Sequence, residues 1–119
     1  MALLTDTRWR VQERKVKALG LEPYFDLIIY TDKFGTDKSD HKIIKKVLRK
    51  FKVSATETAC VGDDPTVDFI GAKELGCRTI RIRQGRLKKL ALSRKYEADS
   101  EVKSFKSLMY ILNVLFKNL

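Results

Sequence analysis

The sequence predicts an α/β protein with a Rossmann-like fold, in which helices cover both faces of a mainly parallel sheet to give three layers. Two observations carry this prediction. Short, almost wholly apolar runs, suited to buried parallel strands, precede stretches whose apolar residues recur with helical spacing. One such run, Ala59–Val61, stops at a glycine and leads into a loop rich in carboxylates, which is typical of a ligand site at a strand's carboxyl end. With 119 residues, the chain is expected to form a single domain over residues 1–119.

The first predicted strand and helix meet at a run of small polar residues. Leu3–Thr5 is a short apolar run that ends in a hydroxyl, and helical periodicity follows over residues 8–19. Thr5, Asp6 and Thr7 therefore lie between a strand end and a helix start. Free N–H groups and the positive end of a helix dipole suit phosphate at such a place. Capping of the helix by Asp6 or Thr7 is a second interpretation, compatible with the first.

A second strand and helix follow in the same order. Residues 27–30 are nearly all apolar, as expected of a buried parallel strand, and a helix is predicted over residues 41–51. Ser39 or Asp40 is expected to cap that helix. Lys38 stands just before it, where a cation gains nothing from the helix dipole. The position of this lysine therefore needs another explanation, or none.

Three carboxylates, Asp63, Asp64 and Asp68, lie within six positions after the strand that ends at Gly62. Pro65 suits the first turn of a helix that would follow them. Clustered anions repel one another unless a positive partner joins them, and Mg²⁺ is a natural partner because it takes oxygen ligands. The alternative is that one aspartate caps the helix and that the others are solvated.

The last third of the chain holds one more strand, a basic stretch and a final helix. The strand is predicted over residues 79–82. The stretch Arg86–Lys95 carries five basic residues and no acid, and we call it the basic segment. A helix is predicted from about Ser104, and its apolar stripe is assigned to the core: Phe105, Leu108, Met109, Leu112, Leu115 and Phe116.

Residues 61–85 resemble the fourth motif of the haloacid dehalogenase (HAD) superfamily. The motif has the form Gly-Asp-x-x-x-x-Asp, and Gly62, Asp63 and Asp68 stand in its fixed places. The resemblance continues through residues 71–76 and the strand after them. It implies an α/β core of the HAD type. It also implies that Asp63 and Asp68, with Asp64, hold the Mg²⁺ of a phosphoryl-transfer site.

Two earlier positions resemble other HAD motifs. Thr5 takes the place of the Thr or Ser that ends the strand of the second motif, with Asp6 where the family often has Asn or Gly. Lys38 takes the place of the third-motif lysine that contacts the phosphoryl group, although Ser39 replaces the usual proline; Lys33 is the competing candidate. The resemblance implies that Thr5, Asp6 and Lys38 bind phosphate, with Thr5 and Lys38 in supporting catalytic roles.

The first HAD motif, Asp-x-Asp-x-Thr, occurs nowhere in these 119 residues, and neither does the cap that follows it in the family. That motif supplies the aspartate nucleophile and sits on the central strand of the HAD sheet. Without that strand, the expected order is 2-1-3-4, which is flavodoxin-like and pairs Leu3–Thr5 directly with Thr58–Val61. The alternative is a gap filled by a second copy of the chain or by a complementing N-terminal fragment.

The composition is strongly basic, with 25 Lys and Arg against 15 Asp and Glu and a formal net charge of +10. A nucleic acid or another polyanion is one explanation. A lysine-rich solvated surface is the other, and we favour it because most of the excess lies on predicted helix faces. Nucleic acid is therefore not the expected partner.

Several features bear on location and on side chemistry. The apolar runs are too short to span a membrane and the N-terminus lacks the pattern of a signal peptide, so we expect a cytoplasmic protein. Cys60 and Cys77 lie at apolar positions beside predicted strands and are interpreted as buried, reduced thiols. His41, the single histidine, has no carboxylate or nucleophile at a suggestive spacing and is interpreted as a surface residue.

These inferences lead to one functional hypothesis and one alternative. The leading hypothesis is a domain related to HAD phosphatases, which keeps motifs for Mg²⁺ and for the phosphate of a small phosphorylated molecule but lacks the aspartate nucleophile. Such a chain would be inactive or would be part of a split or truncated phosphatase. The alternative is a non-catalytic basic module that binds a polyanion or a protein partner.

Overall fold

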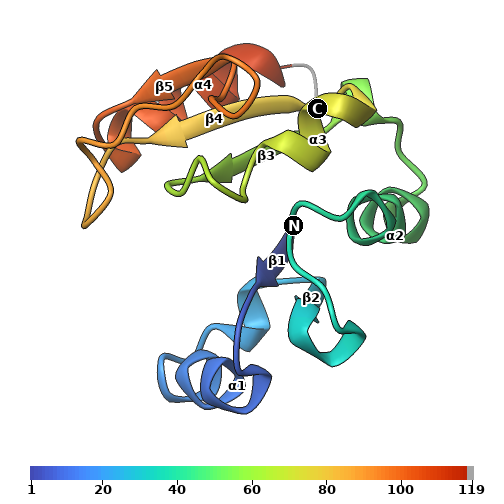
Figure 1. Cartoon of the computed structure of the whole chain (residues 1–119). Helices are drawn as coiled ribbons and strands as arrows, with labels where there is room; N and C mark the ends of the chain where they lie inside the picture. Colours follow the sequence, from blue (N-terminus) through green and yellow to red (C-terminus); the bar gives the residue numbers. More distant parts are fainter. Residues whose placement is uncertain (118–119) are drawn as a thin grey trace. The chain divides into compact units, whose positions relative to one another are not determined.

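The computed structural model describes residues 1–117 and shows the expected alternation of strands and helices (Figure 1). The chain divides into two compact units, Met1–Val53 (unit 1) and Ser54–Leu119 (unit 2), and each is described by itself. Every strand pair in both units is parallel, so the chain is an α/β protein with parallel strands. Within residues 1–117, no helix is both long enough and apolar enough to cross a lipid bilayer.

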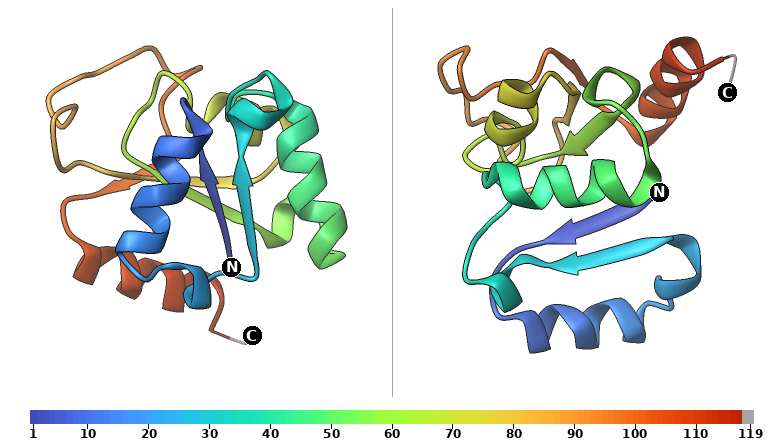
Figure 2. Two further views of the ribbon diagram at one scale, coloured as in Figure 1. Left: turned by 90° about the horizontal axis from the view of Figure 1, so that it is seen from below. Right: turned by 90° about the vertical axis from the view of Figure 1, so that its right-hand side faces the viewer.

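In unit 1 a pair of parallel strands lies between two helices. Strand β1 pairs with β2, with Ala2 opposite Leu27 and Thr5 opposite Tyr30. Helices α1 and α2 lie on opposite sides of this pair (Figure 2). The regular elements of the unit are β1 (Ala2–Thr5), α1 (Trp9–Ala18), β2 (Leu27–Tyr30), α2 (His41–Phe51) and 3-10 helices at Glu22–Tyr24 and Thr31–Phe34. Its buried apolar side chains are Val16, Ile29, Ile43 and Ile44.

In unit 2 three parallel strands are joined in the order β3-β4-β5. The elements are a 3-10 helix at Ala55–Glu57, β3 (Ala59–Gly62), α3 (Ile70–Leu75), β4 (Arg78–Ile82), β5 (Ser100–Val102) and α4 (Phe105–Leu115). Helix α4 packs against β4 and β5. A core cluster forms there from Ile80, Ile82, Val102 and Leu108, with Ile111, Leu112 and Leu115 packed against it.

The expected pairings of neighbouring strands are present, but the expected single sheet is not. Hydrogen bonds within residues 1–117 place the strands in two sheets, β1-β2 and β3-β4-β5. No ladder joins Leu3–Thr5 to Ala59–Gly62, so the order 2-1-3-4 is corrected at its central step. The reason is that the HAD sheet has its first-motif strand between these two, and that strand is not in the chain. Each sheet therefore keeps its own edge strand.

Three further expectations need correction. Strand β5 is not anticipated by the sequence. Pro65 lies in a turn, because α3 begins only at Ile70. On α4, Phe105 and Met109 are 65% and 56% exposed, so these two members of the predicted core stripe face solvent, whereas Leu108 is buried.

Candidate functional site

At the carboxyl end of β1, Asp6 acts as a structural acceptor. Its Oδ1 atom accepts hydrogen bonds from the Thr31 hydroxyl at 2.6 Å and from the Lys38 backbone N–H at 3.0 Å. The Thr31 hydroxyl also lies 3.3 Å from the backbone oxygen of Thr5. Thr31 is fully buried, so the contact is well shielded from water. In unit 1, the three residues assigned to phosphate, Thr5, Asp6 and Lys38, are thus brought together through Asp6.

The turn between β1 and α1 has an unusual backbone. Thr7 and Arg8 have φ angles of 57° and 23°, which residues with a side chain rarely adopt. Neither Asp6 nor Thr7 caps α1, so that interpretation is wrong. Instead, the Trp9 N–H donates to Oδ2 of Asp32 at 3.1 Å. Strained backbone of this kind is often found at ligand sites. The assignment of this corner to phosphate stays a prediction.

The two candidate lysines have different surroundings. The Nζ atom of Lys33 lies 4.2 Å from the centre of the Trp9 ring and 4.0 Å from a Glu13 carboxylate oxygen. Lys33 is therefore placed against α1. Lys38 is half-buried and its backbone is held by Asp6, directly before α2. This favours Lys38 over its competitor, while the phosphate contact itself stays a prediction.

In unit 2, the carboxylates of the acidic loop (residues 63–69) have separate roles. Oδ2 of Asp68 accepts the backbone N–H groups of Asp63 at 3.0 Å and Asp64 at 2.9 Å. Oδ1 of Asp64 accepts the backbone N–H and the hydroxyl of Thr66 at 3.0 and 2.5 Å. Asp63 is the exposed member, directly after the carboxyl end of β3. Asp68 thus shapes the loop, and Asp63 presents its carboxylate to solvent.

Gly62 makes this turn possible because no side chain fits there. A Cβ atom built on Gly62 would lie 2.2 Å from Oδ2 of Asp68 and 2.6 Å from its Cγ. The loop backbone can therefore fold tightly over the Asp68 carboxylate only with glycine at this position. The sequence pattern Gly62, Asp63, Asp68 corresponds to one interlocked turn.

The acidic loop fits a magnesium ion held in part by other ligands. Within residues 1–117, no three histidine, cysteine or acidic side chains converge as a metal cluster. Mg²⁺ in phosphoryl-transfer sites is commonly held by one or two carboxylates, with waters and substrate phosphate in the other positions. Asp63 fits such a role as an exposed oxygen ligand. The assignment of Asp63, Asp64 and Asp68 to metal stays a prediction.

Two cysteines lie side by side, Cys60 on β3 and Cys77 directly before β4. Cys77 is buried and Cys60 is half-buried, and neither forms a disulfide. The hydrogen bond between the two thiols, together with burial, raises the pKa of Cys60. Protonation of the Cys60 thiol is therefore favoured.

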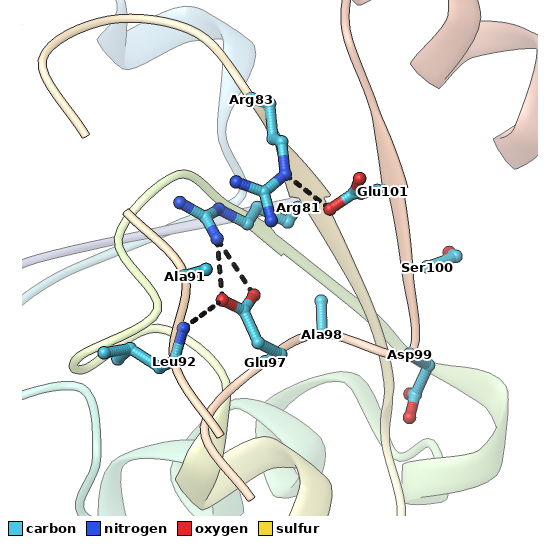
Figure 3. A pocket seen from close by; sticks show the side chains of 9 residues that line it. All are labelled: Arg81, Arg83, Ala91, Leu92, Glu97, Ala98, Asp99, Ser100 and Glu101. Atoms are coloured by element: carbon cyan, nitrogen blue, oxygen red, sulfur yellow. Dashed lines mark hydrogen bonds and ion pairs between the residues drawn. The ribbon is translucent and has the colours of Figure 1, made fainter. Parts of the chain in front are cut away.

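A buried ionic network on β4 was not anticipated by the sequence. Arg81 is fully buried, and its Nη1 atom donates to both carboxylate oxygens of Glu97, at 2.8 and 3.0 Å (Figure 3). Arg83 donates from Nε to Glu101 at 2.6 Å (Figure 3). These residues line a cavity of about 300 Å³, together with Ala91 and Leu92 of the basic segment. Only the alternation of Arg81 and Arg83 on one face of a strand hinted at this pairing.

Burial and hydrogen bonding act in opposite directions on Glu97. Burial raises its pKa, but the Leu92 N–H, which donates to Oε1 at 2.9 Å, and the Arg81 guanidinium together outweigh burial. The pKa of Glu97 is therefore held below its ordinary value, and the side chain is ionised at neutral pH. Arg81 is thus neutralised within the fold.

The sequence match identifies the class of protein to which this fold and these motifs belong. A family model described as haloacid dehalogenase-like hydrolase matches residues 1–82. The chain therefore belongs to the haloacid dehalogenase-like hydrolases. Members of this family typically use Mg²⁺.

Among curated proteins, the relatives are phosphatases. The chain is 33% identical over 118 residues to a glyceraldehyde 3-phosphate phosphatase of Methanocaldococcus jannaschii, covering 99% of this chain and 51% of the relative. It is 32% identical over 110 residues to the enzyme of the same name from Pyrococcus furiosus, covering 92% and 46%. A phosphoserine phosphatase of Thermus thermophilus is 33% identical over 85 residues, covering 71% and 34%. The chain spans about half the length of the first two relatives.

Solved structures agree on the fold. A HAD hydrolase from Bacillus subtilis, bound to magnesium, superposes with a TM-score of 0.81 at 22% identity, covering 94% of this chain and 48% of that one. A HAD phosphatase from Thermococcus onnurineus gives a TM-score of 0.72 at 29% identity, covering 87% and 46%. The chain thus has the fold of a HAD fragment and is related to HAD-family phosphatases.

Proposed function

We propose that this chain is the phosphate- and magnesium-binding portion of a HAD-family phosphatase that acts on small phosphate esters. The observation that carries the proposal is the turn at Gly62. There Asp68 fixes the loop backbone through two hydrogen bonds, and Asp63 is left exposed at the carboxyl end of β3. This geometry gives the fourth-motif residues distinct tasks. Asp63 would hold Mg²⁺, which would neutralise charge on a bound phosphoryl group.

The residues of unit 1 would position the ester. Thr5 would donate its hydroxyl to a phosphate oxygen, and Lys38 would offset the phosphate charge. Asp6 would support both by fixing the Thr31 hydroxyl and the Lys38 N–H, rather than by contacting phosphate.

Under this proposal, the residues of this chain do not supply the aspartate nucleophile of the family. In this family an aspartate oxygen attacks phosphorus, the ester oxygen leaves with a proton, and water then cleaves the aspartyl phosphate. No Asp-x-Asp-x-Thr pattern occurs in these residues to supply that aspartate or its acid–base partner. We therefore expect no efficient turnover by these residues alone. The names of the curated relatives support a small phosphorylated metabolite as substrate.

Magnesium binding tests the proposal. Mg²⁺ at about ten times its dissociation constant would stabilise the fold by about 1.4 kcal/mol. In a chain of this size that corresponds to a rise of roughly 6 °C in melting temperature. Asp63→Asn should abolish the rise, whereas Glu74→Gln, which changes another exposed acid of unit 2, should keep it. If the parent protein melts at the same temperature with and without Mg²⁺, the proposed metal site is excluded.

One observation favours a second candidate, a basic module that binds a polyanion. The five basic side chains of the basic segment are all exposed. For this candidate, retention of RNA should fall steeply as salt rises, because bound phosphates release counterions. Absence of retention at low salt would exclude it.

A further inference from the structure

The basic segment begins beside the acidic loop. Strands β3 and β4 are parallel, with Gly62 opposite Arg81, so the loops that follow them leave the same end of the sheet of unit 2 (Figure 1). Gly85 joins β4 to the basic segment. A Cβ atom built on Gly85 would lie 3.9 Å from Oδ2 of Asp63, which is van der Waals contact. A ligand held at Asp63 therefore lies next to the first residues of the segment.

The backbone of the segment is fastened to the sheet by buried and half-buried cations. Arg81 donates from Nη2 to the Leu87 carbonyl at 2.9 Å, and Arg83 donates from Nη1 to the carbonyls of Lys88 and Leu90 at 3.0 and 3.1 Å. Figure 3 shows the acids with which the two arginines pair, Glu97 with Arg81 and Glu101 with Arg83. The start of the segment is thus held in place before any ligand arrives, which lowers the entropic cost of binding.

The far end of the segment is fastened in the same way. Nζ of Lys73, on α3, donates to the carbonyl of Arg94 at 2.8 Å and to that of Glu97 at 2.9 Å. The cations that hold the segment therefore come from the sheet and from α3. The basic side chains of the segment itself do not hold its backbone in this way but are exposed to solvent: Arg86, Lys88, Lys89, Arg94 and Lys95.

We propose that Arg86, with Lys88 and Lys89, forms a subsite for a second anionic group of the substrate. The substrate would then be a phosphate ester that also carries a carboxylate or another phosphoryl group. This inference rests on the proposed function, because it takes the Mg²⁺ that would meet the ester phosphate to be held at Asp63. Arg86 directly follows Gly85, and a guanidinium group suits carboxylate and phosphate oxygens because it can donate two parallel hydrogen bonds. Asp63 would hold the Mg²⁺ that meets the ester phosphate, and the basic side chains would hold the second anionic group.

A small ligand with two separate anionic groups fits this surface better than RNA does. Proteins that hold single strands combine cations with aromatic side chains on which bases stack. Tyr96 is the single aromatic residue in positions 86–96, and Lys95 lies over its ring, 5.7 Å from the centre. The first cation of the basic segment, Arg86, also follows Gly85, which lies next to Asp63. A phosphate ester is already expected at that place. RNA binding is therefore an outcome for the test rather than the proposal.

The test compares two esters of similar size in the presence of Mg²⁺ and at fixed ionic strength. 3-Phosphoglycerate carries a carboxylate in addition to its phosphate, whereas glycerol 3-phosphate carries only the phosphate. Calorimetry should show that 3-phosphoglycerate binds the chain about fivefold more tightly, the upper end for an exposed ion pair. Arg86→Ala should remove this preference. Lys106→Ala, which removes an equal charge from an exposed position on α4, should keep it.

Each other outcome overturns the inference in a recognisable way. If both esters bind equally while Mg²⁺ still raises the melting temperature, the subsite is wrong and the proposed function stands. If neither ester binds and Mg²⁺ has no effect, the proposed function fails and the subsite fails with it. If Arg86→Ala and Lys106→Ala lose the preference for 3-phosphoglycerate to the same extent, net charge alone attracts the ester. Salt-sensitive RNA retention without any preference between the esters would assign the segment to a polyanion.

Discussion

Aspartates that look equivalent in the sequence perform different tasks in the structure. Asp6 and Asp68 accept hydrogen bonds from backbone N–H groups and hold loops in shape. Asp63 is exposed, and its part in these bonds is to donate its own backbone N–H to Asp68. The sequence could place all three at strand ends, because strand and loop patterns are local. It could not separate a loop-shaping carboxylate from a ligand-facing one, since that depends on which N–H groups the folded turn brings near.

The tight turn at Gly62 predicts that a single added Cβ atom at this position destabilises the fold. In Gly62→Ala, the new Cβ would overlap the Asp68 carboxylate and displace it from the N–H groups of Asp63 and Asp64. The expected loss of stability is about 1–3 kcal/mol, measured by urea denaturation. Combining it with Asp68→Gly provides the control, because that change removes all three Asp68 atoms that the new methyl group would meet, Oδ2, Cγ and Cβ. The two substitutions should then cost clearly less together than the sum of their separate costs. Simple additivity would show that the clash is not the cause.

The Arg81–Glu97 ion pair predicts a pH dependence. Glu97→Gln leaves the fully buried Arg81 without its counter-charge and should lower stability at pH 7 by about 2–4 kcal/mol. The pKa of Glu97 is lowered in the folded state, so the stabilisation is fully present above the ordinary value of 4.5. It is lost as the pH falls through the lowered folded-state value. Urea midpoints at pH 7, 5, 4 and 3 should therefore show the gap between parent and variant closing in acid.

A neighbouring pair serves as the control for that experiment. Glu101 pairs with Arg83, but its side chain is 53% exposed, so water already screens the pair. Glu101→Gln should change the urea midpoint little at any pH. A gap for Glu97→Gln that stays constant from pH 7 to pH 3 would mean that the loss comes from packing rather than from charge.

Among whole elements, those with strong local signals were predicted well. Strand β2 and helix α2 have the predicted bounds, because a short apolar run and a helical stripe of eleven residues need no distant partner to be recognised. Asp40 caps α2 as one of the two expected candidates, accepting the Lys42 N–H at 2.8 Å. Helix α1 also lies within one residue of its predicted ends.

Strand β5 shows why the rest could not be predicted. Ser100, Glu101 and Val102 have no apolar alternation, and only Val102 is buried. The segment is a strand because β4 offers it a free edge and because Asp99 is tied to Thr79. Oδ2 of Asp99 accepts the Thr79 N–H and hydroxyl at 3.0 and 2.9 Å. Such a strand is specified by its neighbours, twenty residues away in sequence, and leaves no local pattern.

The cap of α4 gives a prediction at the scale of the element. Oγ of Ser104 accepts the N–H of Ser107 at 3.1 Å and so satisfies one of the open N–H groups at the helix start. Ser104→Ala should lower stability by about 1 kcal/mol, and Ser104→Asp should restore it, because aspartate also caps. Ser107→Ala is the matched control, since it removes a hydroxyl from the same turn but keeps the backbone N–H. Thermal unfolding followed by circular dichroism measures all three variants. Equal losses from both alanine variants would argue against the cap.

For the whole molecule, the resemblance to a family supplied what local patterns could not. It assigned Thr5 and Lys38 of unit 1 and Asp63 of unit 2 to one kind of chemistry, although 58 positions separate the first from the last. The sequence match and the structural similarity agree with that family. What the resemblance could not supply was the pairing of strands, because the family's sheet includes a strand that this chain lacks. The sheet order was therefore the weakest part of the fold prediction.

The edges of the two sheets lead to the final prediction. Within residues 1–117, β1 pairs only with β2, and β3 only with β4. Both edge strands are uncharged, and Val61 in β3 is 42% exposed, so these edges lack the charged residues that usually protect an unpaired strand. A parallel strand added there would cover apolar surface and pair open backbone groups. We expect that strand to bring the missing nucleophile.

Complementation tests whether such a strand completes an enzyme. The chain should be co-expressed with the part of the Methanocaldococcus jannaschii relative that it does not match, and assayed with p-nitrophenyl phosphate. Mg²⁺-dependent hydrolysis should appear only in the mixture. It should disappear with Asp63→Asn and persist with Glu74→Gln, because Glu74 lies on α3, outside the acidic loop. Turnover by the chain alone would contradict the proposal directly, since attack on phosphorus would then require a nucleophile that the family pattern does not place in these residues.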